Sequence, residues 1–215
     1  MTPNVAPGPA LLASRVLAVV RGTEGRHMAA VLDTLAEAGI RCLEVTMNTP
    51  GALDELRAAR GRLPAEVELG GGTVLTADQV DAVADRGGSF VVAPDVRPAV
   101  ADRACARGLA YYPGAMTPTE VGTAWQSGAS AVKLFPASLG GPRYLRELRG
   151  PLREVPLLPT GGVGIDDAGG YLKAGALAVG VGGALIGDAL DGGDLAALRE
   201  RALRLLASVA EASRG

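Results

Sequence analysis

Histidine, cysteine and lysine are scarce in this chain, and the scarcity of the first two argues against particular kinds of site. The single histidine, His27, disfavours a zinc site built on imidazoles, while a carboxylate-bound Mg²⁺ stays open. The two cysteines, Cys42 and Cys105, form no CxxC pair and no disulfide framework, so we expect reduced thiols in a cytoplasmic protein. The net charge of −2 comes without a basic cluster interleaved with aromatic residues, which disfavours nucleic-acid binding. No apolar run reaches transmembrane length, which disfavours a membrane protein.

Lysine is rarer than the charge count suggests, because Lys133 and Lys173 are the only two among 21 basic residues and the others are arginines. Lys133 lies in the middle of the apolar run 129–136, which has the small and branched residues of a buried parallel strand. A buried ammonium is costly, and burial favours the free amine, which is a nucleophile for ketones and aldehydes. The run therefore suggests Schiff-base chemistry. A structural lysine paired with a buried carboxylate is the alternative.

The composition predicts one globular domain of class α/β. With 215 residues, 48% of them hydrophobic, the chain can bury a sizeable core. We expect residues 1–15 to form an N-terminal arm with a short helix, and residues 16–215 to form the domain. Apolar, strand-like runs begin near Val16, Cys42, Val67, Ser89, Leu109, Ala131, Leu157 and Leu177. Helical periodicity follows over residues 26–38, 51–60, 77–85, 97–107, 118–126, 142–148, 166–173 and, after a short turn near 183–189, 195–212.

Eight alternations of strand and helix predict a single-domain (β/α)8 barrel, the TIM barrel. An open doubly wound sheet is the structural alternative, but residues 21–25 do not match the Gly-rich fingerprint that normally follows its first strand. Helix signals agree with the barrel units. Thr76 and Thr117 stand at N-cap positions, and Gly39 and Gly175 stand where helices should end.

The unusual residues gather at the expected C-terminal ends of the strands, which converge on the catalytic face of such a barrel. They are Arg21, Glu44, Thr46, Asn48, Gly72, Thr73, Pro94, Pro113, Gly114, Lys133, Phe135, Thr160, Gly161, Gly162, Gly182 and Gly183. Period-two alternation puts Glu44 and Thr46 on one face of their strand, and Lys133 and Phe135 on one face of theirs. With both faces inside the barrel, Glu44 approaches Lys133 and can move protons for imine chemistry. A structural Glu–Lys pair is the alternative.

Two glycine-containing segments, 159–163 and 179–184, close the seventh and eighth strands. Loops at these positions are the usual phosphate site of this barrel, because their N–H groups reach an anion and a short helix near Gly183 points its positive end there. We therefore predict phosphate binding by a set of four glycines, with a tight turn that binds no ligand as the alternative. The four are Gly161, Gly162, Gly182 and Gly183.

The third and first strands end in residues suited to a carboxylate. Thr73 follows Gly70–Gly72 and offers a hydroxyl with close backbone approach, which suits a small carboxylate such as that of pyruvate. Arg21 can add a bidentate contact to a carboxylate or a phosphate. The alternatives are that the glycines only form a turn, and that the arginine is a salt-bridged residue at the rim of the barrel.

Four motifs resemble those of the 2-keto-3-deoxy-6-phosphogluconate (KDPG) aldolase family in order and spacing. They are 43–46 (LEVT), 71–75 (GGTVL), 132–136 (VKLFP) and 159–163 (PTGGV). The resemblance spans about residues 16–189. It implies a class I aldolase without a cofactor, usually a homotrimer, that cleaves a 2-keto-3-deoxy-6-phospho sugar acid to pyruvate and glyceraldehyde 3-phosphate.

The resemblance also implies roles for individual residues. Lys133 would form the Schiff base and Glu44 would move protons. Thr73 and Arg21 would hold the pyruvyl and substrate end, and the glycines of the seventh and eighth strand loops would hold the phosphate. We include Pro94, Phe135 and Asn48 among the expected substrate-binding residues.

One position departs from the gluconate-type pattern. Members of that type generally carry an arginine two residues after the strand-end threonine, where this chain has Asn48. Residues 48–50 and 135–144 resemble the 2-dehydro-3-deoxy-6-phosphogalactonate branch more closely. The two substrates differ at the C4 hydroxyl, which a neutral amide and a cationic fork would contact differently. We therefore predict the phosphogalactonate substrate, with the gluconate epimer or dual specificity as the alternative.

Two rival functions use the same barrel. A metal-free phosphosugar isomerase or epimerase would need the phosphate loops but no imine. A non-catalytic phosphosugar-binding protein would keep the loops and be indifferent to Lys133→Arg.

Overall fold

The computed structural model describes residues 5–214, in which parallel strands alternate with helices. The strands are β1 (Val16–Val20), β2 (Cys42–Thr46), β3 (Glu68–Gly72), β4 (Phe90–Val92), β5 (Ala110–Tyr112), β6 (Gly114–Ala115), β7 (Val132–Leu134), β8 (Leu157–Pro159) and β9 (Val179–Val181). The helices are α1 (Pro9–Ser14), α2 (Met28–Glu37), α3 (Ala52–Arg62), α4 (Ala77–Ala84), α5 (Pro98–Ala106), α6 (Pro118–Gln126), α7 (Gly141–Arg149), α8 (Ala168–Lys173), α9 (Gly183–Ile186) and α10 (Leu195–Ala212). Two 3₁₀ turns, η1 (Ala137–Leu139) and η2 (Ala189–Asp191), complete the elements.

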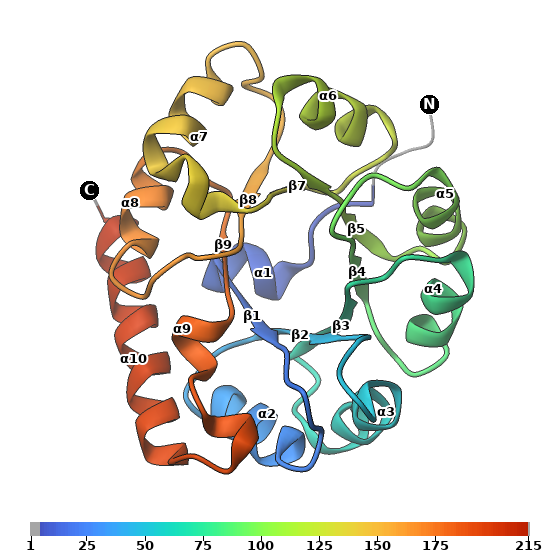
Figure 1. Ribbon diagram of the computed structural model, residues 1–215, viewed down its shortest axis with the longest axis vertical. Helices are drawn as coiled ribbons and strands as arrows, with labels where there is room; N and C mark the ends of the chain where they lie inside the picture. Colours follow the sequence, from blue (N-terminus) through green and yellow to red (C-terminus); the bar gives the residue numbers. More distant parts are fainter. Residues whose placement is uncertain (1–4, 215) are drawn as a thin grey trace.

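The strands form two parallel sheets with most of the helices outside them. The larger sheet has the order β5-β4-β3-β2-β1-β9 and the smaller one the order β6-β7-β8. Figure 1 shows the strands gathered in the centre, with α2 to α8 and α10 arranged around them. The fold is therefore of class α/β with a curled parallel sheet, as the alternation of strand and helix predicts.

Hydrogen bonds link the two sheets at both junctions. Thr160, just after β8, forms an isolated parallel bridge with Gly180 of β9. At the other junction, the N–H of Lys133 donates to the carbonyl of Pro113 at 2.9 Å. The sequence predicts one strand starting near Leu109, whereas the structure has β5 and β6 on either side of Pro113. Proline lacks the N–H that a continuous ladder would need at this position.

Local signals set most helix boundaries. The Thr117 hydroxyl accepts from the N–H of Glu120, whose carboxylate accepts in return from the N–H of Thr117, forming a complete capping box at α6. Thr76 accepts from the N–H three residues on at the start of α4. Gly39 and Gly175 have φ angles of +105° and +100° after α2 and α8, a conformation that favours glycine. The predicted bounds 118–126 and 195–212 are confirmed.

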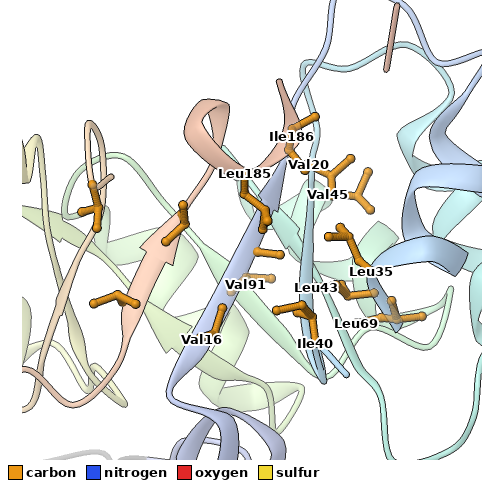
Figure 2. Packing of buried hydrophobic residues seen from close by; sticks show 14 of the residues in the cluster. Val16, Val20, Leu35, Ile40, Leu43, Val45, Leu69, Val91, Leu185 and Ile186 are labelled. Atoms are coloured by element: carbon orange, nitrogen blue, oxygen red, sulfur yellow. The ribbon is translucent and has the colours of Figure 1, made fainter. Parts of the chain in front are cut away.

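The core has two layers because alternate strand residues point to opposite sides. Val20, Leu43 and Val45 belong to a cluster that packs against outer helices, where Leu35 of α2 meets them (Figure 2). The inner cluster lies on the other side of the strands and includes Leu11, Leu17, Val19, Cys42, Phe90, Val92, Ala110, Tyr112, Ala131, Leu158 and Ala178. Ala131 and Cys42 share strand faces with Lys133 and Glu44, so these two ionisable residues face the inner side.

The expected short helix at the N-terminus is present as α1. Leu11 of this helix is fully buried in the inner cluster. The Glu68 carboxylate accepts from the N–H of Ala10 at 3.0 Å, which satisfies a first-turn amide that has no partner within the helix. Residues 1–4 of the expected arm lie outside the described residues. Within residues 5–214, no helix combines the length and apolar character needed to cross a membrane.

Candidate active site

Lys133 occupies the middle of β7 with both neighbours buried. The residue is 2% exposed, and its Nζ lies 4.8 Å from the centre of the Phe135 ring. Burial lowers the pKa of Lys133, the nearby Glu44 carboxylate opposes that shift, and the Arg21 guanidinium adds to it. The free amine is therefore more populated here than on a solvated lysine.

Glu44 occupies the middle of β2 and is fully buried. Among the described residues, neither carboxylate oxygen has a hydrogen-bond partner. Burial raises the pKa of Glu44, whereas the charges of Lys133 and Arg21 act in the opposite direction. A Cβ on Gly72 of β3 would overlap the Glu44 carboxylate. The absence of a side chain at Gly72 therefore leaves room for that carboxylate.

Lys133 and Glu44 are neighbours without forming a direct ion pair. Each affects the pKa of the other, yet no ion pair within 4.0 Å joins them among the described residues. A purely structural pair would be expected in direct contact, because close charge pairing offsets the cost of burial. The separation suits two groups that act on a molecule between them.

Arg21 and Thr73 meet across the ends of β1 and β3. Nη2 of Arg21 donates a hydrogen bond to the Thr73 hydroxyl oxygen, at an N–O distance of 3.2 Å. Thr73 has a φ of +56°, in the left-handed region that a β-branched residue rarely adopts and that costs about 1–3 kcal/mol. The two residues predicted to hold a carboxylate are therefore in contact with each other, and their binding role stays a prediction.

The predicted phosphate loops border one cavity of about 290 Å³. It is lined by Val19, Arg21, Phe135, Thr160, Gly161, Gly162, Gly182 and Gly183. Gly161 and Gly162 have φ angles of +87° and +73°, and a Cβ on Gly162 would come within 2.6 Å of the Ser138 hydroxyl. A Cβ on Gly183 would meet nothing within 4 Å, so that position leaves open space at the start of α9.

Two predicted substrate residues border other cavities at the same end of the strands. Pro94 lines a cavity of about 390 Å³ that Phe135 also borders, so it adjoins the lysine site. Asn48 is exposed and lines a third cavity of about 450 Å³ with Pro50, Asp54 and other residues. The structure therefore brings Arg21 and the four glycines together, whereas Asn48 lines a separate cavity that shares no residue with theirs.

Two hydroxyl residues at the site were not singled out from the sequence. Ser138 packs against Gly162, and its N–H donates to the carbonyl of Gly161 at 3.1 Å. Thr49 is 2% exposed and its hydroxyl joins the loops after β1 and β2. Ser138 could have been found as a polar residue just after the lysine strand, whereas the partners of Thr49 give no local sequence signal.

The chain is similar to known aldolases along most of its length. The family model described as "Aldolase: KDPG and KHG aldolase" matches residues 9–200. The protein of Rhizobium meliloti (strain 1021) named "Probable 2-dehydro-3-deoxy-6-phosphogalactonate aldolase" is 34% identical over 194 residues, covering 90% of each chain.

Two solved structures share the fold over most of their length. The structure described as "Native KDPGal structure" is 28% identical with a TM-score of 0.85, covering 93% of this chain and 96% of that one. The KDPG aldolase of Legionella pneumophila, with pyruvate captured at low pH as a covalent carbinolamine intermediate, is 25% identical with a TM-score of 0.79, covering 91% and 96%. The family match over 192 of its residues and the Rhizobium meliloti relative, matched over 90% of each chain, together establish that this chain belongs to the KDPG and KHG aldolase family.

Proposed function

We propose that the protein is a class I aldolase that cleaves 2-dehydro-3-deoxy-6-phosphogalactonate to pyruvate and glyceraldehyde 3-phosphate. The observation that carries the proposal is the buried Lys133 with the buried Glu44 beside it, at the catalytic end of parallel strands. The carbinolamine in the Legionella pneumophila relative supports covalent chemistry with pyruvate. No cofactor enters the proposed reaction.

The first step joins Lys133 to the keto acid. The neutral Nζ attacks the C2 carbonyl, the carbonyl oxygen takes up a proton, and the resulting carbinolamine loses water to give a protonated imine. Glu44 is the acid that protonates the departing hydroxyl. Burial supports both roles, because it lowers the pKa of Lys133 and raises the pKa of Glu44.

The imine then drives carbon–carbon cleavage. The Glu44 carboxylate removes the proton of the C4 hydroxyl, the C3–C4 bond breaks, and its electron pair moves towards the imine nitrogen to give an enamine. Glyceraldehyde 3-phosphate leaves at this point. Protonation of the enamine at C3, followed by hydrolysis of the imine, releases pyruvate and restores Lys133. One carboxyl group can serve each of these proton transfers.

Binding residues surround the two reacting groups in this proposal. Arg21 and Thr73 hold the carboxylate end, supported by the hydrogen bond between them. Phe135 and Pro94 flank the pyruvyl group, supported by the position of the Phe135 ring over Nζ. The phosphate lies against backbone N–H groups of the loops after β8 and β9, where glycines border the 290 Å³ cavity: Gly161, Gly162, Gly182 and Gly183.

The preference for the phosphogalactonate epimer is the finer part of the proposal. It is supported by the name of the Rhizobium meliloti relative and by Asn48 in place of a cationic side chain. The role proposed for Asn48 is a contact with the part of the substrate near C4, although the cavity that Asn48 lines shares no residue with the cavity of the phosphate loops. The gluconate epimer, or both epimers, is the alternative, and kcat/KM measured for each epimer decides between them.

We also propose that residues 16–215 form a closed, single-domain (β/α)8 barrel after an N-terminal segment 1–15, and that the protein is a cytoplasmic homotrimer. The hydrogen bonds at both junctions between the sheets support closure. Light scattering on the purified protein tests the assembly: three times the mass of one chain is expected, and any other mass contradicts the trimer.

Borohydride trapping tests the central claim, and the two lysines of the chain provide a matched pair. Incubation with pyruvate followed by reduction should leave an adduct on Lys133. Lys133→Arg should lose both the adduct and turnover, whereas Lys173→Arg, at an exposed position of α8, should keep both. Turnover without an adduct would refute the imine mechanism and favour an isomerase or a metal-dependent route.

A further inference from the structure

Two loops at the catalytic end are joined by a buried chain of hydroxyl groups. The loop after β1 (residues 21–27) carries Arg21, and the loop after β2 (residues 47–51) carries Asn48. The hydroxyls of Thr46 and Thr49 are hydrogen-bonded to each other at 2.9 Å. The Thr49 hydroxyl also accepts from the N–H of Gly22 at 3.2 Å.

Burial makes these hydrogen bonds difficult to replace. Thr46 is fully buried and Thr49 is 2% exposed, so solvent cannot readily take over either hydroxyl. The N–H of Gly22 would lose its acceptor if the Thr49 hydroxyl were absent, and a part-buried donor without a partner is unfavourable.

Close packing of the two loops leaves little room for adjustment. A Cβ on Gly25 would overlap the carbonyl of Pro50, so the loops touch through their backbones. A Cβ on Gly22 would lie 2.9 Å from a methyl group of Leu190, which closes the other side of the first loop. The first loop is therefore held between the second loop and η2, with the Thr49 hydroxyl as the polar contact.

The Thr49 contact acts on the residue next to Arg21. Gly22 directly follows Arg21, whose side chain reaches Thr73 at 3.2 Å. Arg21 is exposed and long, so its productive geometry depends on where its backbone is held. We propose that Thr49 is a positioning residue for Arg21, an inference that rests on the proposed role of Arg21 in binding the anionic substrate.

The test begins with a variant that removes only the hydroxyl. Thr49→Val keeps the shape of the side chain, and we expect the KM for the phosphorylated keto-deoxy acid to rise about 2- to 10-fold, the range expected for one net hydrogen bond. The kcat should stay within about 2-fold, because loss of binding common to ground and transition states raises KM alone. Thr49→Ser, which keeps the hydroxyl, should restore the KM.

A matched control separates positioning from general loss of a threonine hydroxyl. Thr34 of α2 is half-buried, and its hydroxyl donates to the carbonyl of Ala30 at 2.7 Å within the same helix. Thr34→Val should leave KM and kcat unchanged. An equal rise in KM for Thr34→Val and Thr49→Val would overturn the proposal.

A double-mutant cycle identifies the residue through which Thr49 acts. If Thr49 works through Arg21, Thr49→Val should have no further effect on KM in an Arg21→Ala background. Independent, multiplicative effects of the two substitutions would contradict the positioning role, even if each one alone raises KM.

Hydrogen exchange keeps this inference distinct from the proposed function. The Gly22 amide should be protected in the wild type and exchange at least about 10-fold faster in Thr49→Val, in the absence of any substrate. A wild type that forms no adduct with pyruvate refutes the proposed function, whereas exchange unchanged by Thr49→Val refutes the loop contact.

Discussion

Replacing Gly72 by alanine moves the Glu44 carboxylate without altering Glu44 itself. The added Cβ would overlap the carboxylate, and the atoms it meets are the outer atoms of a side chain that can rotate away. Such a rotation costs about 0.5–1.5 kcal/mol, which for a chain of this size lowers Tm by only a few degrees. Displacement of a catalytic group by about 1 Å can cost about 100-fold in rate. We therefore expect kcat to fall about 100-fold while the protein stays folded.

Two other glycines provide controls with different expected outcomes. A Cβ on Gly71 would overlap Val83, so Gly71→Ala should lower stability by about 1–3 kcal/mol with a much smaller effect on kcat. A Cβ on Gly61 in α3 would meet nothing within 4 Å, so Gly61→Ala should stabilise the protein by about 1 kcal/mol and leave kcat unchanged.

Pyruvate release, followed with lactate dehydrogenase and NADH, measures kcat, and calorimetry measures Tm. If Gly72→Ala keeps kcat within about 3-fold of the wild type, the position of the Glu44 carboxylate does not limit the reaction, and its proposed role is wrong.

Substitutions at three further positions have distinct expected results. Burial lowers the pKa of Lys133, so protonation of this residue favours the unfolded state as the pH falls from about 10 towards the lowered pKa of the folded protein. The difference in unfolding free energy between Lys133→Met and the wild type, measured in urea, should therefore grow as the pH falls through this range. A difference in unfolding free energy that stays constant with pH would contradict the lowered pKa of Lys133. Thr73→Ala and Thr73→Gly should both weaken pyruvate binding, and the glycine variant should be the more stable because it relieves a cost of about 1–3 kcal/mol at φ +56°; equal melting temperatures would argue against strain. Gly183→Ala should leave Tm unchanged and raise the KM of the phosphorylated substrate about 10-fold, without affecting borohydride trapping of pyruvate; an unchanged KM would exclude this position from the phosphate site.

Much of the fold follows from local patterns that the sequence carries openly. The bounds of α6 and α10 coincide with the expected ranges because the capping threonine and proline of α6 and the apolar periodicity of α10 are local signals. Lys133 and Glu44 were found because an ionisable residue in an apolar strand is costly unless it has a role. The division of one expected strand at Pro113 was missed, although the proline was visible, because the sequence alone does not say which ladder needs its N–H.

The parts that the sequence did not reveal depend on contacts between distant segments. The link from Thr49 to Gly22 joins two loops 27 residues apart, and no periodicity encodes it. The left-handed backbone of Thr73 is also imposed by its surroundings, since threonine itself disfavours that region. Asn48 is adjacent to the strand end in sequence, yet its loop turns it towards a separate cavity.

Burial of Lys133 and Glu44 explains how one pair can supply both a nucleophile and an acid. For each residue, burial has the largest effect on its pKa and exceeds the opposing attraction of the partner's charge, so both shift towards their neutral forms. A free amine with a protonated carboxyl group holds the same number of protons as an ammonium with a carboxylate. Transfer of one proton from Lys133 to Glu44, carried by a molecule bound between them, therefore activates the nucleophile and leaves the acid that removes water from the carbinolamine, with no net uptake or release of protons. A tight ion pair at the same place would stabilise the charged forms and oppose both roles. Among the described residues, no hydrogen bond or ion pair joins the two side chains, and this fits catalysis better than a structural role.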